Sequence, residues 1–92
     1  MKYIIYKKVK YGNNKEYKLY YIVFARFTTD IKAATRFRTE EDAAQRYIYE
    51  TYYELAKVED RKDIDDNNIL YIAKIDDNSN IISETKYYKF KL

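Results

Sequence analysis

A chain of 92 residues offers one hydrophobic core and one ligand surface, because a chain of this length buries only roughly 60–65% of its unfolded surface. It contains no cysteine and no histidine, which excludes disulfides, thiolate or imidazole catalysis and zinc sites made of the usual ligands. The net charge of +3 is the sum of +8 in residues 1–38, −8 in residues 39–84 and +3 in residues 85–92, so basic and acidic surfaces are expected to lie apart.

The first two predicted elements form a β-hairpin. The stretches KYIIYKKVK and EYKLYYIVFARF are rich in aromatic and β-branched residues, and YGNNK between them holds Gly12, Asn13 and Asn14, which tolerate positive φ. Both faces of the second strand are apolar, which predicts a central strand with a helix over one side. The side chains are Leu19, Tyr21, Val23, Ala25 and Phe27 on one face and Tyr20, Ile22 and Phe24 on the other.

A capped turn and the main helix come next along the chain. TTDIKAA predicts a short helical turn capped by Thr29 or Asp30, and TRFR predicts a short strand that runs into Thr39. Three acidic residues follow Thr39, whose hydroxyl can cap free amides while the carboxylates oppose the positive end of the helix dipole. The pattern therefore predicts a helix that begins after Thr39 and ends at about Lys57.

The predicted helix carries four tyrosines in the stretch QRYIYETYYEL. At 100° per residue its apolar residues fall on one side, which is expected to face the core. Tyr47 and Tyr52 flank that side, whereas Tyr49 and Tyr53 fall on the opposite side and are expected to face solvent. The residues of the core side are Ala44, Ile48, Thr51, Leu55 and Val58.

An acidic loop and a second hairpin complete the chain. EDRKDIDDNN predicts the loop, and ILYIAKI and TKYYKFKL predict two strands around the turn DDNSN, with Ile82, Tyr88, Phe90 and Leu92 on one face. With no proline and a single glycine, residues 1–92 are expected to form one domain. The predicted fold is α+β: an antiparallel sheet of four or five strands with one main helix packed on one face, in the order ββ(β)αββ.

The outward-facing tyrosines predict a protein-binding surface, because interfaces are enriched in Tyr and Arg. The neighbouring acidic loop can imitate a run of phosphates and so block a basic groove on a partner. The alternative interpretation is that the tyrosines cover core side chains and that the loop is simply solvated. The predicted surface, which can also support a homodimer, comprises Arg46, Tyr49, Glu50, Tyr53, Glu54, Lys57, Glu59, Asp60, Asp63, Asp65 and Asp66.

The basic strands predict an alternative function, the binding of single-stranded DNA or RNA. Cations hold phosphates, and rings such as Tyr6, Tyr20, Phe24 and Tyr87 stack on bases. The competing interpretation is that lysines on edge strands keep sheets from aggregating. The cations of this alternative are Lys7, Lys8, Lys10, Arg26, Arg36, Arg38, Lys86, Lys89 and Lys91, with Lys18 beside them.

Catalytic and metal-binding patterns are weak. DDNSNIISE begins like a calcium loop but lacks the glycine at its sixth position and the glutamate at its twelfth, where Tyr87 stands, so a hairpin turn explains it better. Glu84 and Lys86 downstream of Asp76 or Asp77 imitate the Asp…Glu-x-Lys pattern of magnesium nucleases, which common residue types match by chance. We therefore expect no enzymatic activity, no metal and no cofactor.

The stretch YYIVFARFTTDIKAATRFRTEEDAAQRYI, about a third of the chain, is similar to a pattern of small phage and prophage proteins. Its parts are a strand, a Thr-Asp turn, a small-residue pair, an aromatic residue and a capped Thr-Glu-Glu helix. Lys, Ile, Tyr and Asn, all encoded by A/T-rich codons, make up 43 of the 92 residues, which points to an AT-rich source such as a low-GC bacterium or its phage. The chain thus resembles the accessory proteins that phages use against host defences, anti-CRISPR proteins among them.

This resemblance implies a non-enzymatic inhibitor that occludes a host nucleic-acid-processing complex, such as a CRISPR effector. It supplies no site residues, because these inhibitors share little sequence. No run of about 18 apolar residues occurs, so we expect a protein of the cytoplasm, namely the host cytoplasm if a phage encodes it.

Overall fold

The N-terminal third forms the predicted hairpin. In the computed structural model, which describes residues 1–12, 14–59 and 63–91, β1 (Lys2–Tyr11) pairs antiparallel with β2 (Lys15–Ile22). Gly12 (φ 32°) and Asn14 (φ 62°) take left-handed positions in the turn, where both residue types are tolerated.

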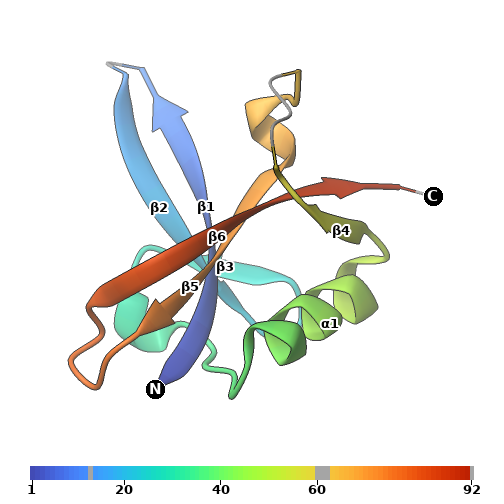
Figure 1. Ribbon diagram of the computed structural model, residues 1–92. Helices are drawn as coiled ribbons and strands as arrows, with labels where there is room; N and C mark the ends of the chain where they lie inside the picture. The colour runs from blue at the N-terminus through green and yellow to red at the C-terminus, as the bar shows by residue number, and fades with distance from the viewer. Residues whose placement is uncertain (13, 60–62, 92) are drawn as a thin grey trace.

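Six strands of the described residues make one antiparallel sheet, in the order β3-β2-β1-β5-β6-β4 (Figure 1). The other elements are β3 (Arg26–Thr28), β4 (Glu54–Lys57), β5 (Ile69–Ile75), β6 (Ile81–Phe90), the helix α1 (Glu40–Thr51) and the short 3₁₀ helices η1 (Ile31–Ala33) and η2 (Asp66–Asn68). The predicted α+β fold is confirmed, with six strands in place of four or five.

The strand predicted to continue to Phe27 is broken by a turn. The chain reverses at Val23, Phe24 and Ala25 and returns as β3, so these three residues do not occupy the strand faces predicted for them. Tyr21 and Phe27 nevertheless share the face toward α1, because they pair across β2 and β3. The Val23 N–H donates to the Thr35 hydroxyl oxygen at 2.9 Å, which ties the turn to the following segment.

The helix begins where the sequence predicts and ends earlier. The Thr39 side chain accepts a hydrogen bond from the Asp42 N–H at 3.0 Å, as expected of an N-cap. Tyr52 takes a left-handed conformation (φ 61°) that ends the helix at Thr51. Residues 54–57, predicted as the last helical turn, instead form β4, because their backbone pairs with β6 at the edge of the sheet.

This early end changes which tyrosines face the core. Tyr47 is buried beside Ala43, whereas Tyr52, predicted to flank the core, is 89% exposed. Tyr53, predicted to face solvent, is half-buried against the core, and Tyr49 is exposed as predicted. The predicted core positions Ala44, Ile48, Thr51, Leu55 and Val58 are all half-buried.

Hydrophobic clusters lie on both faces of the sheet. The cluster under α1 includes Ile5, Tyr21, Phe37, Ala43, Tyr47, Leu70, Ile72 and Tyr87. The cluster on the opposite face is formed by Ile4, Tyr6, Ala34, Ala73 and Ile75, and Ile31 of η1 packs against it. Asp30 caps η1 by accepting from the Lys32 N–H at 2.9 Å, so the predicted capped turn is confirmed and covers this second cluster.

Glu40 joins α1 to the far strands of the sheet. The Thr85 and Tyr87 hydroxyls donate to its carboxylate oxygens at 2.7 and 2.6 Å, and the Lys57 Nζ lies 3.8 Å away. Burial raises the pKa of Glu40, but the two hydroxyl donors and Lys57 outweigh burial and hold this pKa below its usual value. The ionised form of Glu40 is therefore the form that the fold favours.

The second hairpin, β5 and β6, is also present as predicted. Asp76 accepts hydrogen bonds from the Asn78 and Asn80 N–H groups at 2.9 Å each, which closes the turn. The rings of Tyr88 and Phe90 lie 5.4 Å apart on one face, and Leu92, predicted beside them, lies outside the described residues. Throughout the described part of the chain, no helix is long and apolar enough to span a membrane.

Candidate functional site

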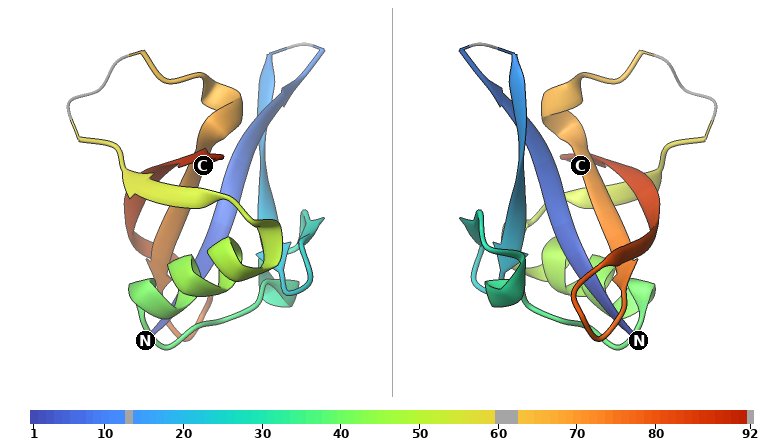
Figure 2. Two further views of the ribbon diagram at one scale, coloured as in Figure 1. Left: turned by 90° about the vertical axis from the view of Figure 1, so that its right-hand side faces the viewer. Right: turned by 90° about the vertical axis from the view of Figure 1, so that its left-hand side faces the viewer.

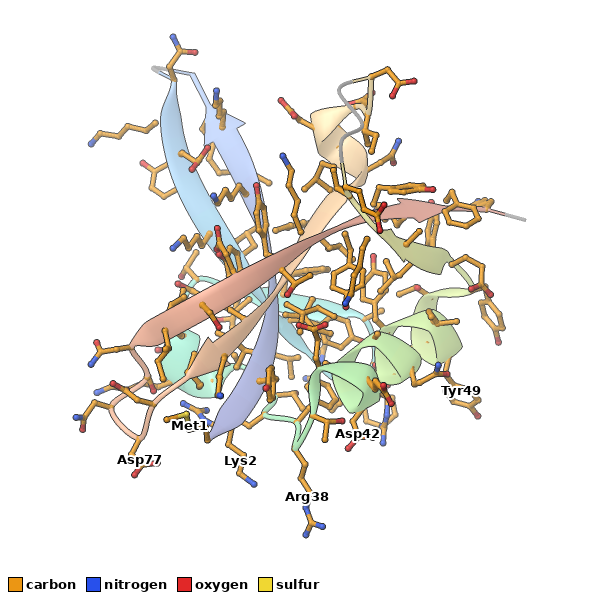
Figure 3. The ribbon with its side chains drawn as sticks, viewed as in Figure 1. Met1, Lys2, Arg38, Asp42, Tyr49 and Asp77 are labelled. Carbon is orange, nitrogen blue, oxygen red and sulfur yellow. The ribbon has the colours of Figure 1, made fainter. Side chains whose placement is uncertain are left out.

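Three large aromatic side chains stand exposed where the β2–β3 turn meets the end of α1. Phe24 is 75% exposed, Tyr49 80% and Tyr52 89%. Tyr49 projects from the helix away from the sheet (Figure 3). We call this site the aromatic corner. It comprises Phe24, Tyr49 and Tyr52, together with Glu50 and with Arg46, which lies one helical turn before Tyr49 and Glu50. Large exposed apolar side chains gathered in one region of the surface are typical of interaction sites on soluble proteins.

Two of the three aromatic residues sit on an unfavourable backbone. Phe24 (φ 71°) and the adjacent Ala25 (φ 58°) are both left-handed, a pair that hairpin turns usually fill with Asn-Gly. Tyr52 (φ 61°) occupies the left-handed position after a helix, which glycine fills most often. Each costs roughly 1 kcal/mol compared with glycine, so the local fold does not account for the choice of these side chains.

The carboxylate of Glu50 holds the corner together. Its side chain is only 6% exposed. The Phe24 N–H donates to both carboxylate oxygens at 2.8 Å, the Tyr21 hydroxyl donates to the same carboxylate, and the Arg46 guanidinium lies 3.9 Å away. Glu50 therefore fixes the left-handed turn of Phe24 against α1, and it is not the exposed interface residue predicted from the sequence.

The charge of Glu50 is favoured in this setting. Burial raises the pKa of the carboxyl, but the hydrogen bonds from Tyr21 and Phe24 and the charge of Arg46 more than offset burial and hold the pKa below its usual value. Burial raises the pKa of the Tyr21 hydroxyl, and the hydrogen bond to Glu50 raises it further. The phenol therefore stays protonated and remains a donor. Glu50 thus acts as a fixed anion beneath an exposed aromatic surface.

A shallow hollow continues the corner along the outer face of α1. It has a volume of about 520 Å³ and is lined by Arg36, Phe37, Arg38, Asp42, Gln45, Arg46 and Tyr49. Arg38, Asp42 and Tyr49 project from the same end of the molecule (Figure 3). The three arginines make this hollow predominantly basic, so the predicted interface cation Arg46 meets the predicted nucleic-acid-binding residues Arg36 and Arg38 here.

The rest of the predicted protein-binding surface is dispersed. Tyr53 packs on the core, Glu54 lies on β4 opposite Phe90, and Lys57 reaches Glu40. The acidic residues Glu59, Asp63, Asp65 and Asp66 belong to the β4–β5 connection, at the opposite end of the sheet from α1 (Figures 1 and 2), and Asp60 lies outside the described residues. The predicted continuous surface of helix face and acidic loop is therefore wrong.

The predicted nucleic-acid-binding cations do not lie on one surface. Lys8 and Lys10 line a cleft of about 520 Å³ where β1 parts from β5, opposite Asp66 of η2. Lys86 pairs with Tyr71 on that same face of the sheet. The remaining members lie elsewhere: Lys7, Lys89 and Lys91 on the face toward α1, Arg26 on β3, and Arg36 and Arg38 before α1.

The sequence predicts Arg46, Tyr49 and Glu50 as interface residues and does not predict Phe24 or Tyr52 there. Phe24 was placed on a strand face and Tyr52 beside the core. The stretch VFAR carries no local signal for the tight turn, because it contains no glycine or asparagine. In the ranges that the structure describes, no group of three acidic side chains is placed to hold a metal ion.

Comparisons of the chain with protein-family models, with curated proteins and with solved structures find no match.

Proposed function

We propose that this protein is a non-enzymatic binding protein that docks a partner protein through the aromatic corner. One observation carries the proposal: Phe24 and Tyr52 are among the most exposed aromatic residues, yet both occupy backbone positions that favour glycine or asparagine. Unfavourable backbone conformations cluster at functional sites. The carboxylate of Glu50, committed to Tyr21 and the Phe24 N–H, holds Phe24 in this conformation.

The chemistry of the corner describes its partner. Aromatic side chains bury about 150–250 Å² each, and Tyr and Arg dominate the energetics of interfaces. The partner therefore offers apolar pockets for Phe24, Tyr49 and Tyr52. Because the adjoining hollow carries three arginines, we expect the partner to have acidic groups around those pockets. An acidic rim on the partner replaces the basic groove expected from the sequence, because the acidic loop lies far from the corner.

The resemblance to phage accessory proteins supports a more specific form of the proposal. In that form the partner is a protein subunit of a host nucleic-acid-processing complex, and the bound protein blocks its action without catalysis. In this proposal the contact is made by aromatic anchors rather than by an acidic imitation of phosphates, because the exposed aromatic side chains lie apart from the acidic loop.

The proposal predicts which substitutions weaken binding. Phe24→Ala and Tyr49→Ala are each expected to weaken capture of the partner by about 30-fold, the ~2 kcal/mol typical of a central interface anchor. Tagged variants are incubated with lysate of a low-GC Gram-positive host, treated with nuclease, and the captured proteins are quantified by mass spectrometry. Tyr11→Ala, which removes a 59% exposed tyrosine on the ordinary strand β1, is the matched control and should capture normally. Equal capture by all variants would contradict the proposal.

Tyr52→Gly separates binding from stability. Glycine relieves the left-handed strain at this exposed position, so the free energy of unfolding is expected to rise by about 0.5–1 kcal/mol. Removal of the ring is expected to reduce partner capture in the same experiment. Urea denaturation measures the first effect. A less stable Tyr52→Gly protein would show that the ring packs on the fold and would remove Tyr52 from the proposed interface.

A further inference from the structure

Three lysines converge on the face of the sheet that carries α1. The Lys7 Nζ lies 4.1 Å from the ring centroid of Phe27. The Nζ atoms of Lys89 and Lys91 lie 4.8 and 5.4 Å from the ring centroid of Tyr53, so two ammonium groups share one ring. Such distances correspond to favourable cation–π contacts. We call Lys7, Lys89 and Lys91 the lysine cluster.

Within the described residues, the strand positions on the face of the lysine cluster carry no acidic side chain, as strand alternation and register show, and Glu40 of α1 reaches this face at Thr85, Tyr87 and Lys57. The ion pairs found within the described ranges place Glu40 with Lys57 and Glu50 with Arg46 instead. Burial lowers the pKa of Lys89, and electrostatic repulsion from the charge of Lys7 lowers it further.

Cation–π contact relieves part of this repulsion and leaves the positive charge in place. The rings of Phe27 and Tyr53 are half-buried and hold the lysine stems against the sheet, which restricts the ammonium groups to one region. A bound anion that contacts all three would gain from each charge and would remove the repulsion between Lys7 and Lys89. Cations placed beside aromatic rings are typical of protein surfaces that bind the backbone of single-stranded nucleic acid.

We infer that Lys7, Lys89 and Lys91 bind the phosphate backbone of a single-stranded nucleic acid, with Tyr53 and Phe27 placed to contact its bases. The site lies on different residues from the aromatic corner, so it adds a second binding activity. A protein that held a nucleic-acid strand and its processing protein together would block both at once.

The test measures binding of a fluorescein-labelled twelve-nucleotide oligo(dT) by fluorescence anisotropy at low and moderate salt. The triple variant Lys7→Gln, Lys89→Gln, Lys91→Gln is expected to bind at least tenfold more weakly than the unaltered protein. Each lost phosphate contact should also lower the slope of log K against log salt by ~0.7. The charge-matched control replaces Lys8, Lys10 and Lys18, which extend from the opposite face, with glutamine and should bind normally.

Several results would overturn the inference. Equal losses in the two triple variants would mean that net charge alone attracts the strand. Absence of binding by the unaltered protein would also overturn it. Displacement of the oligonucleotide by inorganic tripolyphosphate at an equal phosphate concentration would assign the cluster to free polyphosphate rather than to nucleic acid. Lys91→Glu, at an exposed position after β6, tests the site without disturbing the core and should by itself weaken binding.

Discussion

Replacing Tyr47 with alanine is expected to lower the free energy of unfolding by about 3–5 kcal/mol, the range for deleting a buried aromatic side chain. Tyr47 is only 3% exposed, and its ring packs edge-on against Tyr21 at a centroid distance of 5.5 Å. The substitution leaves a cavity between α1 and the sheet. A domain of this size has only a few kcal/mol of stability to lose, so much of the variant should be unfolded at 37 °C. Urea denaturation followed by circular dichroism measures the loss.

Tyr49→Ala provides the internal comparison for this prediction. Tyr49 lies two positions further along the same helix and is exposed, so its replacement should change the free energy of unfolding by no more than about 0.5 kcal/mol. The same chemical change is thus expected to cost stability at Tyr47, and to cost partner binding without stability at Tyr49. Similar losses of stability at both positions would contradict the placement of α1 on the sheet.

The difference between these two tyrosines also shows what the sequence can predict. Helical periodicity separates Tyr47 from Tyr49, because residues two positions apart differ by about 200° around the helix axis and so lie on nearly opposite sides. The N-cap at Thr39 and the turn residues Gly12 and Asn14 are equally local signals, and the structure confirms all of them. Each of these features depends on residues close together in the chain.

The features that the sequence did not predict depend on long-range contacts. Leu55 and Val58 continue the helical pattern beyond Tyr52, yet residues 54–57 form β4 because β6, some 30 positions later, offers a strand to pair with. The reversal at Phe24 is invisible locally, because neither Phe nor Ala favours a left-handed backbone. The Glu50 carboxylate, 26 residues away, is what makes that turn stable. Arg46, Tyr49 and Glu50 and the three lysines of the cluster were therefore predicted as individual site residues, whereas their grouping in space was not.

Glu50 is the residue whose loss should affect both fold and site, and Glu50→Ala is expected to cost about 3 kcal/mol of stability. The substitution removes the acceptor of the Tyr21 hydroxyl and of the Phe24 N–H, and buried polar groups that lose a charged partner are costly. Phe24 would also lose its anchor to α1, so partner capture should fall although the aromatic ring is still present.

The milder variant Glu50→Gln isolates the contribution of the charge through pH. Since the pKa of Glu50 is lowered in the folded protein, its ionised form stabilises the fold above the unfolded-state pKa of about 4.3, and this contribution is lost as pH falls through the lower folded-state pKa. The stability difference between the unaltered protein and Glu50→Gln should therefore be full at pH 6–7 and shrink by pH 3. Urea denaturation across that range measures it.

Glu41→Gln is the matched control, because Glu41 lies exposed in the first turn of the same helix. Its stability difference from the unaltered protein should stay within about 0.5 kcal/mol at every pH. A Glu50→Gln deficit that is equal at pH 3 and pH 7 would mean that Glu50 acts by shape and hydrogen bonding alone. A deficit that vanishes in acid would show that a buried negative charge holds the turn of Phe24 in place, so the exposed ring depends on the ionisation of a carboxylate on the helix behind it.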